Sequence, residues 1–167
     1  PAETVFVFPN NKNIQMAAEQ CARLTEKQVV VIPTKTVPQG ISAMLMMDES
    51  ASVEELRENM LEAAEGVHTA LVTYAARDSE YDGYDIRAGE YLALMDGALL
   101  GSFKELDSLF AAISDRAEEF SPSVLSVYYG EDVTGEEAEK AASGLAERFP
   151  DAEMSVVNGG QPVYYYM

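Results

Sequence analysis

Residues 5–40 read VFVFPNNKNIQMAAEQCARLTEKQVVVIPTKTVPQG, and residues 125–166 read LSVYYGEDVTGEEAEKAASGLAERFPDAEMSVVNGGQPVYYY. Each stretch runs from an apolar strand through a polar turn and an amphipathic helix to a second strand. Each then ends in a loop that combines Gln, Gly and Pro. A strand, a helix and a strand joined by short turns predict a right-handed parallel crossover in both places. The stretches start about 120 residues apart, which is too far for a solenoid repeat.

The residues between these stretches predict further helices and strands. Helix starts are expected where Ser or Thr is followed by Glu three positions later, because the two side chains can cap the first turn. These pairs are Ser52 with Glu55, Ser102 with Glu105, and Thr134 with Glu137. Residues 84–103 have the pattern of a β-meander that turns at Asp96 and Gly97. We therefore predict an α/β fold, with two related β-α-β lobes, a mixed sheet, and a central helix plus β-meander.

The same pattern gives the expected domain bounds. Residues 1–120 hold the first β-α-β lobe with the central helix and the β-meander. Residues 121–167 hold the second β-α-β unit, after the break at Ser121, Pro122 and Ser123. A chain of 167 residues can bury a core without a disulfide or a metal, so both parts are expected to pack as one compact domain.

The charge balance is strongly acidic, with 11 Lys and Arg against 29 Asp and Glu and a net charge of −18. Nucleic acid is disfavoured as a partner, because binding phosphates needs a dense basic surface. An anionic membrane surface is disfavoured for the same reason. Two interpretations remain open. The acidity keeps the protein soluble, or it forms a docking face for a basic protein.

The chain has one cysteine, Cys21, and one histidine, His68. A single cysteine excludes a disulfide framework and fits a reducing compartment such as the cytoplasm. Cys21 falls at helical spacing with Ile14, Ala18 and Leu24, so we expect it to fill the core on the apolar face of the first helix. No apolar run approaches the roughly 20 residues that span a bilayer, so no membrane insertion is expected.

A binding site is expected at the carboxyl ends of the first two parallel strands. The loops PNNKN and PTKTVPQG follow these strands, and in open α/β sheets ligands and partners collect at this edge. Its candidate residues are Asn10, Asn11, Lys12, Thr34, Lys35 and Gln39. Turn chemistry explains the same residue types equally well, because Asn favours turns and Pro ends strands. Both interpretations remain open.

Two further groups are weaker candidates. Gly159, Gly160 and Gln161 follow a strand but precede another extended run, so they form no phosphate loop and suit a tight turn or a close backbone approach. Arg77 and Asp78 lie at a strand end, where a local ion pair is the simpler interpretation. The sequence has no G-x-S-x-G motif and no metal-ligand spacing, so we expect neither a catalytic residue nor a metal site.

Five strings occur in order along the chain: PNNKNI, VIPTKTVPQGISA, VTYAARDS with a following DG, YGEDV and NGGQPVYYY. Together they resemble the C-terminal domain of the bacterial fatty acid kinase, the kinase of the dihydroxyacetone-kinase-like type. Family members carry a GGQTMNPS-like segment before the first strand and continue past the terminal tyrosines, and both features are absent here. The chain therefore resembles a piece of a longer protein.

The resemblance implies a cytoplasmic kinase that uses ATP and Mg to phosphorylate the carboxylate of a fatty acid presented by a DegV-type fatty-acid-binding protein. It implies that this part docks the loaded carrier beside the other domains of the parent kinase. No string matches the Asp motif that binds ATP and magnesium in the kinase domain, so this chain alone is expected to be non-catalytic and to need no cofactor. Two alternatives remain open, a phosphatase- or hydrolase-like enzyme and a lipid-binding domain.

Overall fold

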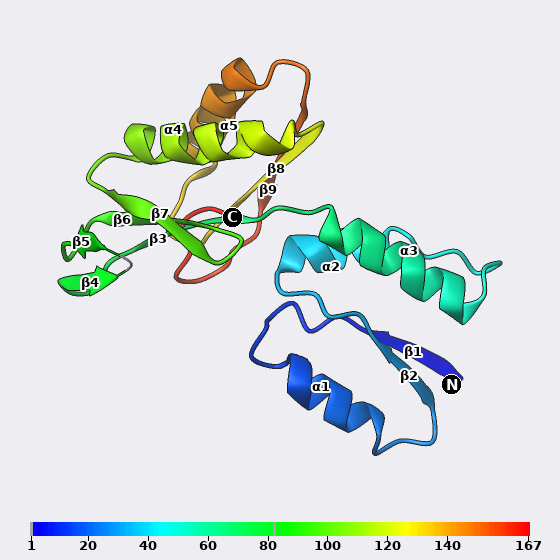
Figure 1. Ribbon diagram of the computed structural model, residues 1–167. Helices are drawn as coiled ribbons and strands as arrows, with labels where there is room; N and C mark the ends of the chain where they lie inside the picture. The colour runs from blue at the N-terminus through cyan, green and yellow to red at the C-terminus, as the bar shows by residue number, and fades with distance from the viewer. Residues whose placement is uncertain (1, 82) are drawn as a thin grey trace. The chain divides into compact units, whose positions relative to one another are not determined.

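The computed structural model describes residues 2–81 and 83–167, which form two units, residues 1–69 and residues 70–167 (Figure 1). Both units are of the α/β type, as the sequence predicts. The observed division lies between Thr69 and Ala70. The domain boundary expected near Ser121 falls inside the second unit, where β8 begins.

The first unit is built on a parallel strand pair, β1 (Thr4–Val7) and β2 (Gln28–Val31), in the register Thr4↔Gln28 to Val7↔Val31. Backbone hydrogen bonds continue the pairing at its carboxyl end, where the Ile32 N–H donates to the Val7 carbonyl over 2.9 Å. The helix α1 (Gln15–Ala22) connects the two strands. The predicted parallel crossover is therefore confirmed.

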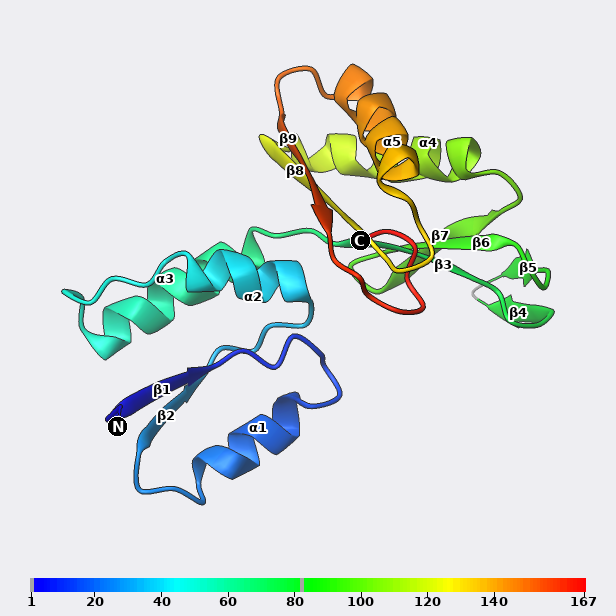
Figure 2. The ribbon, with the colours of Figure 1, turned by 180° about the vertical axis from the view of Figure 1, so that it is seen from behind.

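Two further helices, α2 (Val37–Met44) and α3 (Val53–Glu65), pack against each other on the side of the β1–β2 pair opposite α1 (Figures 1 and 2). The Thr36 side chain caps α2, and the predicted capping box of Ser52 and Glu55 opens α3. The core of this unit is a buried apolar cluster of Ile32, Ala43, Leu56, Met60 and Ala64.

The prediction that α1 buries an apolar face is wrong. Ile14 is 50% exposed, Leu24 is 85% exposed, and Cys21 is exposed rather than part of the core. No residue of α1 is fully buried. The physical reason is the width of the sheet, because two strands offer α1 too narrow a surface to cover a whole helix face.

The second unit contains a mixed sheet. Three antiparallel strands, β3 (Ala70–Tyr74), β6 (Tyr91–Met95) and β7 (Ala98–Phe103), form one part, and the parallel pair β8 (Val124–Tyr129) and β9 (Glu153–Asn158) forms the other. The chain end, residues 164–167, lies between the two parts. The Val72 N–H donates to the Tyr166 carbonyl (2.9 Å), and the Met167 N–H donates to the Tyr128 carbonyl (2.9 Å). The second predicted parallel crossover is confirmed.

Two helices, α4 (Leu106–Ala117) and α5 (Gly135–Arg148), cover one face of this sheet, and the short 3-10 helix η1 (Glu118–Phe120) follows α4 (Figure 1). Their apolar residues meet the strands in a core that includes Val72, Ala93, Leu109, Val127 and Tyr166. The capping box predicted at the start of α5 is present.

The cap predicted at the start of α4 is wrong. The N-cap residue is Glu105, and its side chain makes no capping hydrogen bond. Ser102 lies in β7, where its hydroxyl donates to the Glu90 carboxylate over 2.5 Å. A strand residue beside a carboxylate acceptor is therefore held away from the helix start that local sequence suggested.

The predicted β-meander forms only in part. β6 and β7 join at Asp96 and Gly97, which both have positive φ, as a tight two-residue hairpin turn requires. The first segment, β5 (Tyr84–Ile86), pairs instead with β4 (Ser79–Tyr81) in a separate small hairpin.

Candidate functional site

The carboxyl ends of β1 and β2 bring together two of the predicted site residues, Asn10 and Thr34. The Thr34 hydroxyl donates to Asn10 Oδ1 over 2.8 Å and accepts from the Asn10 backbone N–H over 3.1 Å. Thr34 is 1% exposed, and Asn10 has a φ of 54°, in the left-handed region that Asn tolerates well. This pair of hydrogen bonds ties the loop after β1 to the loop after β2.

Gly40 makes room for this tie. A Cβ atom at position 40 would lie 2.1 Å from Asn10 Oδ1, closer than any real contact allows. The first turn of α2 therefore lies directly against the Asn10 side chain. Because Thr34 and Asn10 satisfy each other, their role in the described structure is to hold the loops, with little hydrogen-bonding capacity left for a ligand.

Lys35 and Gln39 lie beside a hollow of about 270 Å³ in the first unit. The Gln39 side chain accepts from the Lys35 N–H (2.8 Å), and its amide donates to the Val67 carbonyl (3.5 Å). The lining combines apolar and polar side chains: Gln15, Ile32, Pro33, Lys35, Gln39, Leu61, Ala64 and Glu65. Such a lining suits an apolar group that carries a polar end.

Sequence reasoning identified Lys35 and Gln39 but missed Gln15 and the α3 residues Leu61, Ala64 and Glu65. No local pattern could have identified the α3 residues, because α3 reaches this loop only through its packing on α2. Asn11 and Lys12 are exposed in the loop after β1, outside the lining of the hollow. The Asn11 side chain accepts from the Asn13 N–H over 2.9 Å, which is ordinary turn chemistry.

Gly159, Gly160 and Gln161 form a turn in the second unit. The Gly159 and Gly160 N–H groups both donate to the Tyr129 carbonyl, over 3.0 and 3.1 Å. The Gln161 amide donates to the Tyr128 carbonyl over 3.0 Å, and Gly160 has a φ of 59°. The geometry is that of a tight turn with close backbone approach. It leads the chain from β9 toward the central segment 164–167.

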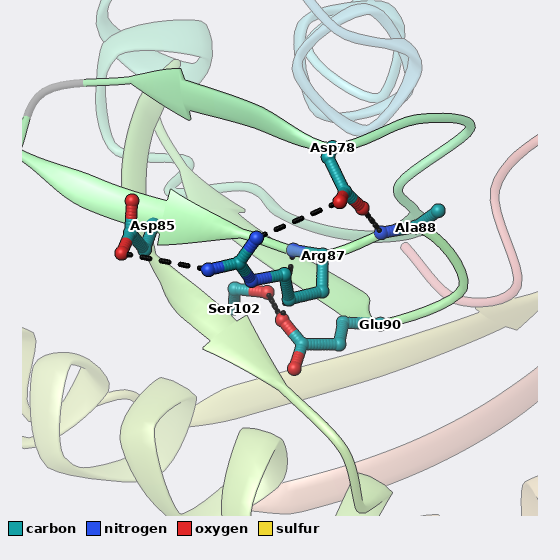
Figure 3. Close-up of polar contacts among 6 residues, drawn as sticks. All are labelled: Asp78, Asp85, Arg87, Ala88, Glu90 and Ser102. Atoms are coloured by element: carbon teal, nitrogen blue, oxygen red, sulfur yellow. Dashed lines mark hydrogen bonds and ion pairs between the residues drawn. The ribbon is translucent and has the colours of Figure 1, made fainter.

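Asp78 forms an ion pair with Arg87 rather than with the neighbouring Arg77 (Figure 3). Its carboxylate lies 3.5 Å from the Arg87 guanidinium and accepts from the Ala88 N–H over 2.8 Å. The simple local pair expected from the sequence is therefore wrong. The antiparallel pairing of β4 with β5 brings Arg87, rather than the adjacent cation, next to Asp78.

Glu90 completes this network at the base of the β4–β5 hairpin. It accepts from the Ser102 hydroxyl and, over 3.1 Å, from the Arg87 N–H (Figure 3). These two hydrogen bonds, the Ser102 bond first, hold the pKa of Glu90 below its ordinary value of 4.5. Both acceptor bonds need the ionised carboxylate, so the hairpin base is fixed at neutral pH.

Comparison with known proteins gives the family. The model of the FakA-like C-terminal family, which describes the C-terminal part of fatty acid kinases, matches residues 1–167. The chain belongs to this family. Protein YloV of Bacillus subtilis is 40% identical over 167 residues, and an uncharacterised protein of Staphylococcus aureus strain USA300 is 35% identical over 162 residues. The chain spans 30% and 29% of these relatives' lengths, while they match 99% and 96% of this chain.

Solved structures of two DegV family proteins share the fold. One, from Corynebacterium glutamicum, has a TM-score of 0.61 at 14% identity and covers 97% of this chain and 69% of its own. The other, from Ruminococcus gnavus and described with vaccenic acid, has a TM-score of 0.64 at 15% identity and covers 94% and 66%. This member of the FakA-like C-terminal family thus has the DegV type of α/β fold.

Neither a membrane span nor a metal cluster occurs among the described residues. In the part of the chain that the structure describes, no helix is both long and apolar enough to cross a bilayer. Within residues 2–81 and 83–167, no three His, Cys, Asp or Glu side chains gather as a metal site.

Proposed function

We propose that this chain is a non-catalytic docking domain of a cytoplasmic fatty acid kinase. It engages a DegV-type fatty-acid-binding protein, so that a kinase domain elsewhere in the parent protein can phosphorylate the fatty acid carboxylate with ATP and Mg. The observation that carries the proposal is the match to the FakA-like C-terminal family of fatty acid kinases over residues 1–167.

The structure of the first unit supports a docking role. The loops after β1 and β2 are fixed by the Asn10–Thr34 pair, so they form a preorganised edge rather than a flexible one. Lys12 and Lys35 are exposed at this edge in a chain of net charge −18. Rare cations on an acidic protein set the orientation of a partner more than the affinity for it.

Direct binding tests the proposal. The chain is immobilised, and the DegV-type protein of the same organism is passed over it with and without a bound fatty acid. We expect saturable binding in both states and no ATP turnover or phosphatase activity by the chain alone. Absence of binding in both states contradicts the docking role. A robust hydrolysis rate that one point substitution abolishes favours the enzyme alternative.

A second candidate function is lipid binding by the chain itself. The observation in its favour is the shared fold with DegV proteins, one of them described with vaccenic acid. Against it, the buried Thr34 hydroxyl, the best candidate to hold a carboxylate beside Lys35, is occupied by Asn10. Mass spectrometry of the purified chain decides, because a bound fatty acid at one mole per mole of protein supports this function.

A further inference from the structure

The helix α2 is apolar on two opposite faces, but only one of them is covered. Gly40 and Ala43 are buried and pack against α3. Val37, Ile41, Met44 and Leu45 follow the spacing i, i+4, i+7 and i+8, which places them together on one side of the helix. These four side chains are 47%, 40%, 60% and 75% exposed. A helix that is apolar all round is normally buried all round.

The chain that follows α2 extends this apolar surface. Met46 is 41% exposed and Met47 is 51% exposed. We name the six side chains the α2 apolar face: Val37, Ile41, Met44, Leu45, Met46 and Met47. Isolated exposed apolar residues are common, but six within eleven positions form a contiguous patch of the kind that marks an interaction site. Three of the six are Met, whose flexible thioether adapts to different apolar partners.

Acidic residues adjoin the α2 apolar face. Residues 48–65, which cover the turn after it and the helix α3, contain seven Asp or Glu and one cation, Arg57. Hydrogen bonds from Ser50 and Ser52 lower the pKa of Asp48 and of Glu55, so both remain charged in mildly acidic solution. Glu54, Glu58 and Glu62 are exposed on α3.

We propose that the α2 apolar face docks an amphipathic helix of the partner protein, whose apolar stripe is flanked by Lys or Arg. The argument is complementarity: an apolar helix face bordered by carboxylates fits an apolar stripe bordered by cations. A membrane surface fits poorly, because the same carboxylates repel anionic headgroups. The inference rests on the proposed function, since it takes the partner to be the DegV-type carrier.

The test compares substitutions on two exposed apolar surfaces of the same unit. Met44→Ser and Leu45→Ser alter the α2 apolar face, and Leu24→Ser alters the end of α1, where the side chain is 85% exposed. All three sites are exposed, so the fold is expected to survive, and circular dichroism and thermal melting check this. Binding of the carrier is measured by surface plasmon resonance. We expect each α2 substitution to raise Kd by roughly tenfold or more and Leu24→Ser to leave it within about twofold.

Charge is tested separately with Glu58→Gln and Glu62→Gln combined. We expect a slower on-rate and a nearly unchanged off-rate, as for a rim charge. The inference is overturned if the α2 variants bind as tightly as the natural sequence while Lys12→Ala or Lys35→Ala weakens binding, although docking itself then stands. It is also overturned if the chain is a dimer that the α2 variants make monomeric, because a second copy is then the occupant. No binding by any form contradicts the docking function together with the inference.

Discussion

At the scale of single residues, Gly40 and Asn10 define the edge where β1 and β2 end. Gly40→Ala places a methyl group 2.1 Å from Asn10 Oδ1, so the Asn10–Thr34 pair must break or α2 must shift. We expect a loss of roughly 1–3 kcal/mol in the free energy of unfolding, measured by urea titration. Gly66→Ala is the matched control, because its Cβ would meet nothing closer than 3.7 Å. A Gly40→Ala variant as stable as this control contradicts the assigned role.

Tyr166 is the residue on which the second sheet depends. It is 4% exposed, its backbone joins β3 to the β8–β9 pair, and its ring meets Phe110 edge-on at 5.2 Å. We expect Tyr166→Ala to cost roughly 3–5 kcal/mol, as large aromatic-to-alanine changes in cores do. Tyr81→Ala, at a site 54% exposed, is expected to change stability by less than about 0.5 kcal/mol. Chemical denaturation of both variants measures the difference, and equal losses contradict the central place of Tyr166.

At the scale of elements, the β4–β5 hairpin depends on the ionisation of Glu90. Its pKa is lowered in the folded protein, so its contribution to stability is present above its ordinary value of 4.5. That contribution is lost as the pH falls below 4.5 through the folded-state pKa. We therefore expect Glu90→Gln to be less stable than the natural sequence from pH 7 to 5, and the gap to close below pH 4.5. Thermal melting across this range checks it, and a gap that persists at pH 3.5 rules it out.

The elements also show what the sequence could predict and what it could not. Parallel pairing of β1 with β2 and of β8 with β9 was predictable, because each crossover is complete within about forty residues. The burial of α1 was not, since it depends on how many strands lie beneath the helix. The role of Ser102 was not either, because Glu90 lies twelve positions away and competes for the hydroxyl. At the candidate site, the loop residues could be found from their place after the strands, whereas the α3 lining could not.

At the scale of the whole molecule, the net charge of −18 predicts how a docking protein associates. If acidic residues attract a basic surface on the carrier, the on-rate is highest at low salt, because exposed charges are screened beyond about 8 Å at physiological ionic strength. Raising the salt concentration is expected to slow association more than it speeds dissociation, since apolar contacts such as those of the α2 apolar face retain the complex. Surface plasmon resonance over a salt series from 50 to 500 mM measures both rates. An on-rate that does not change with salt shows that the acidity serves solubility alone. An off-rate that rises as steeply as the on-rate falls shows that ion pairs, rather than apolar contacts, hold the complex together.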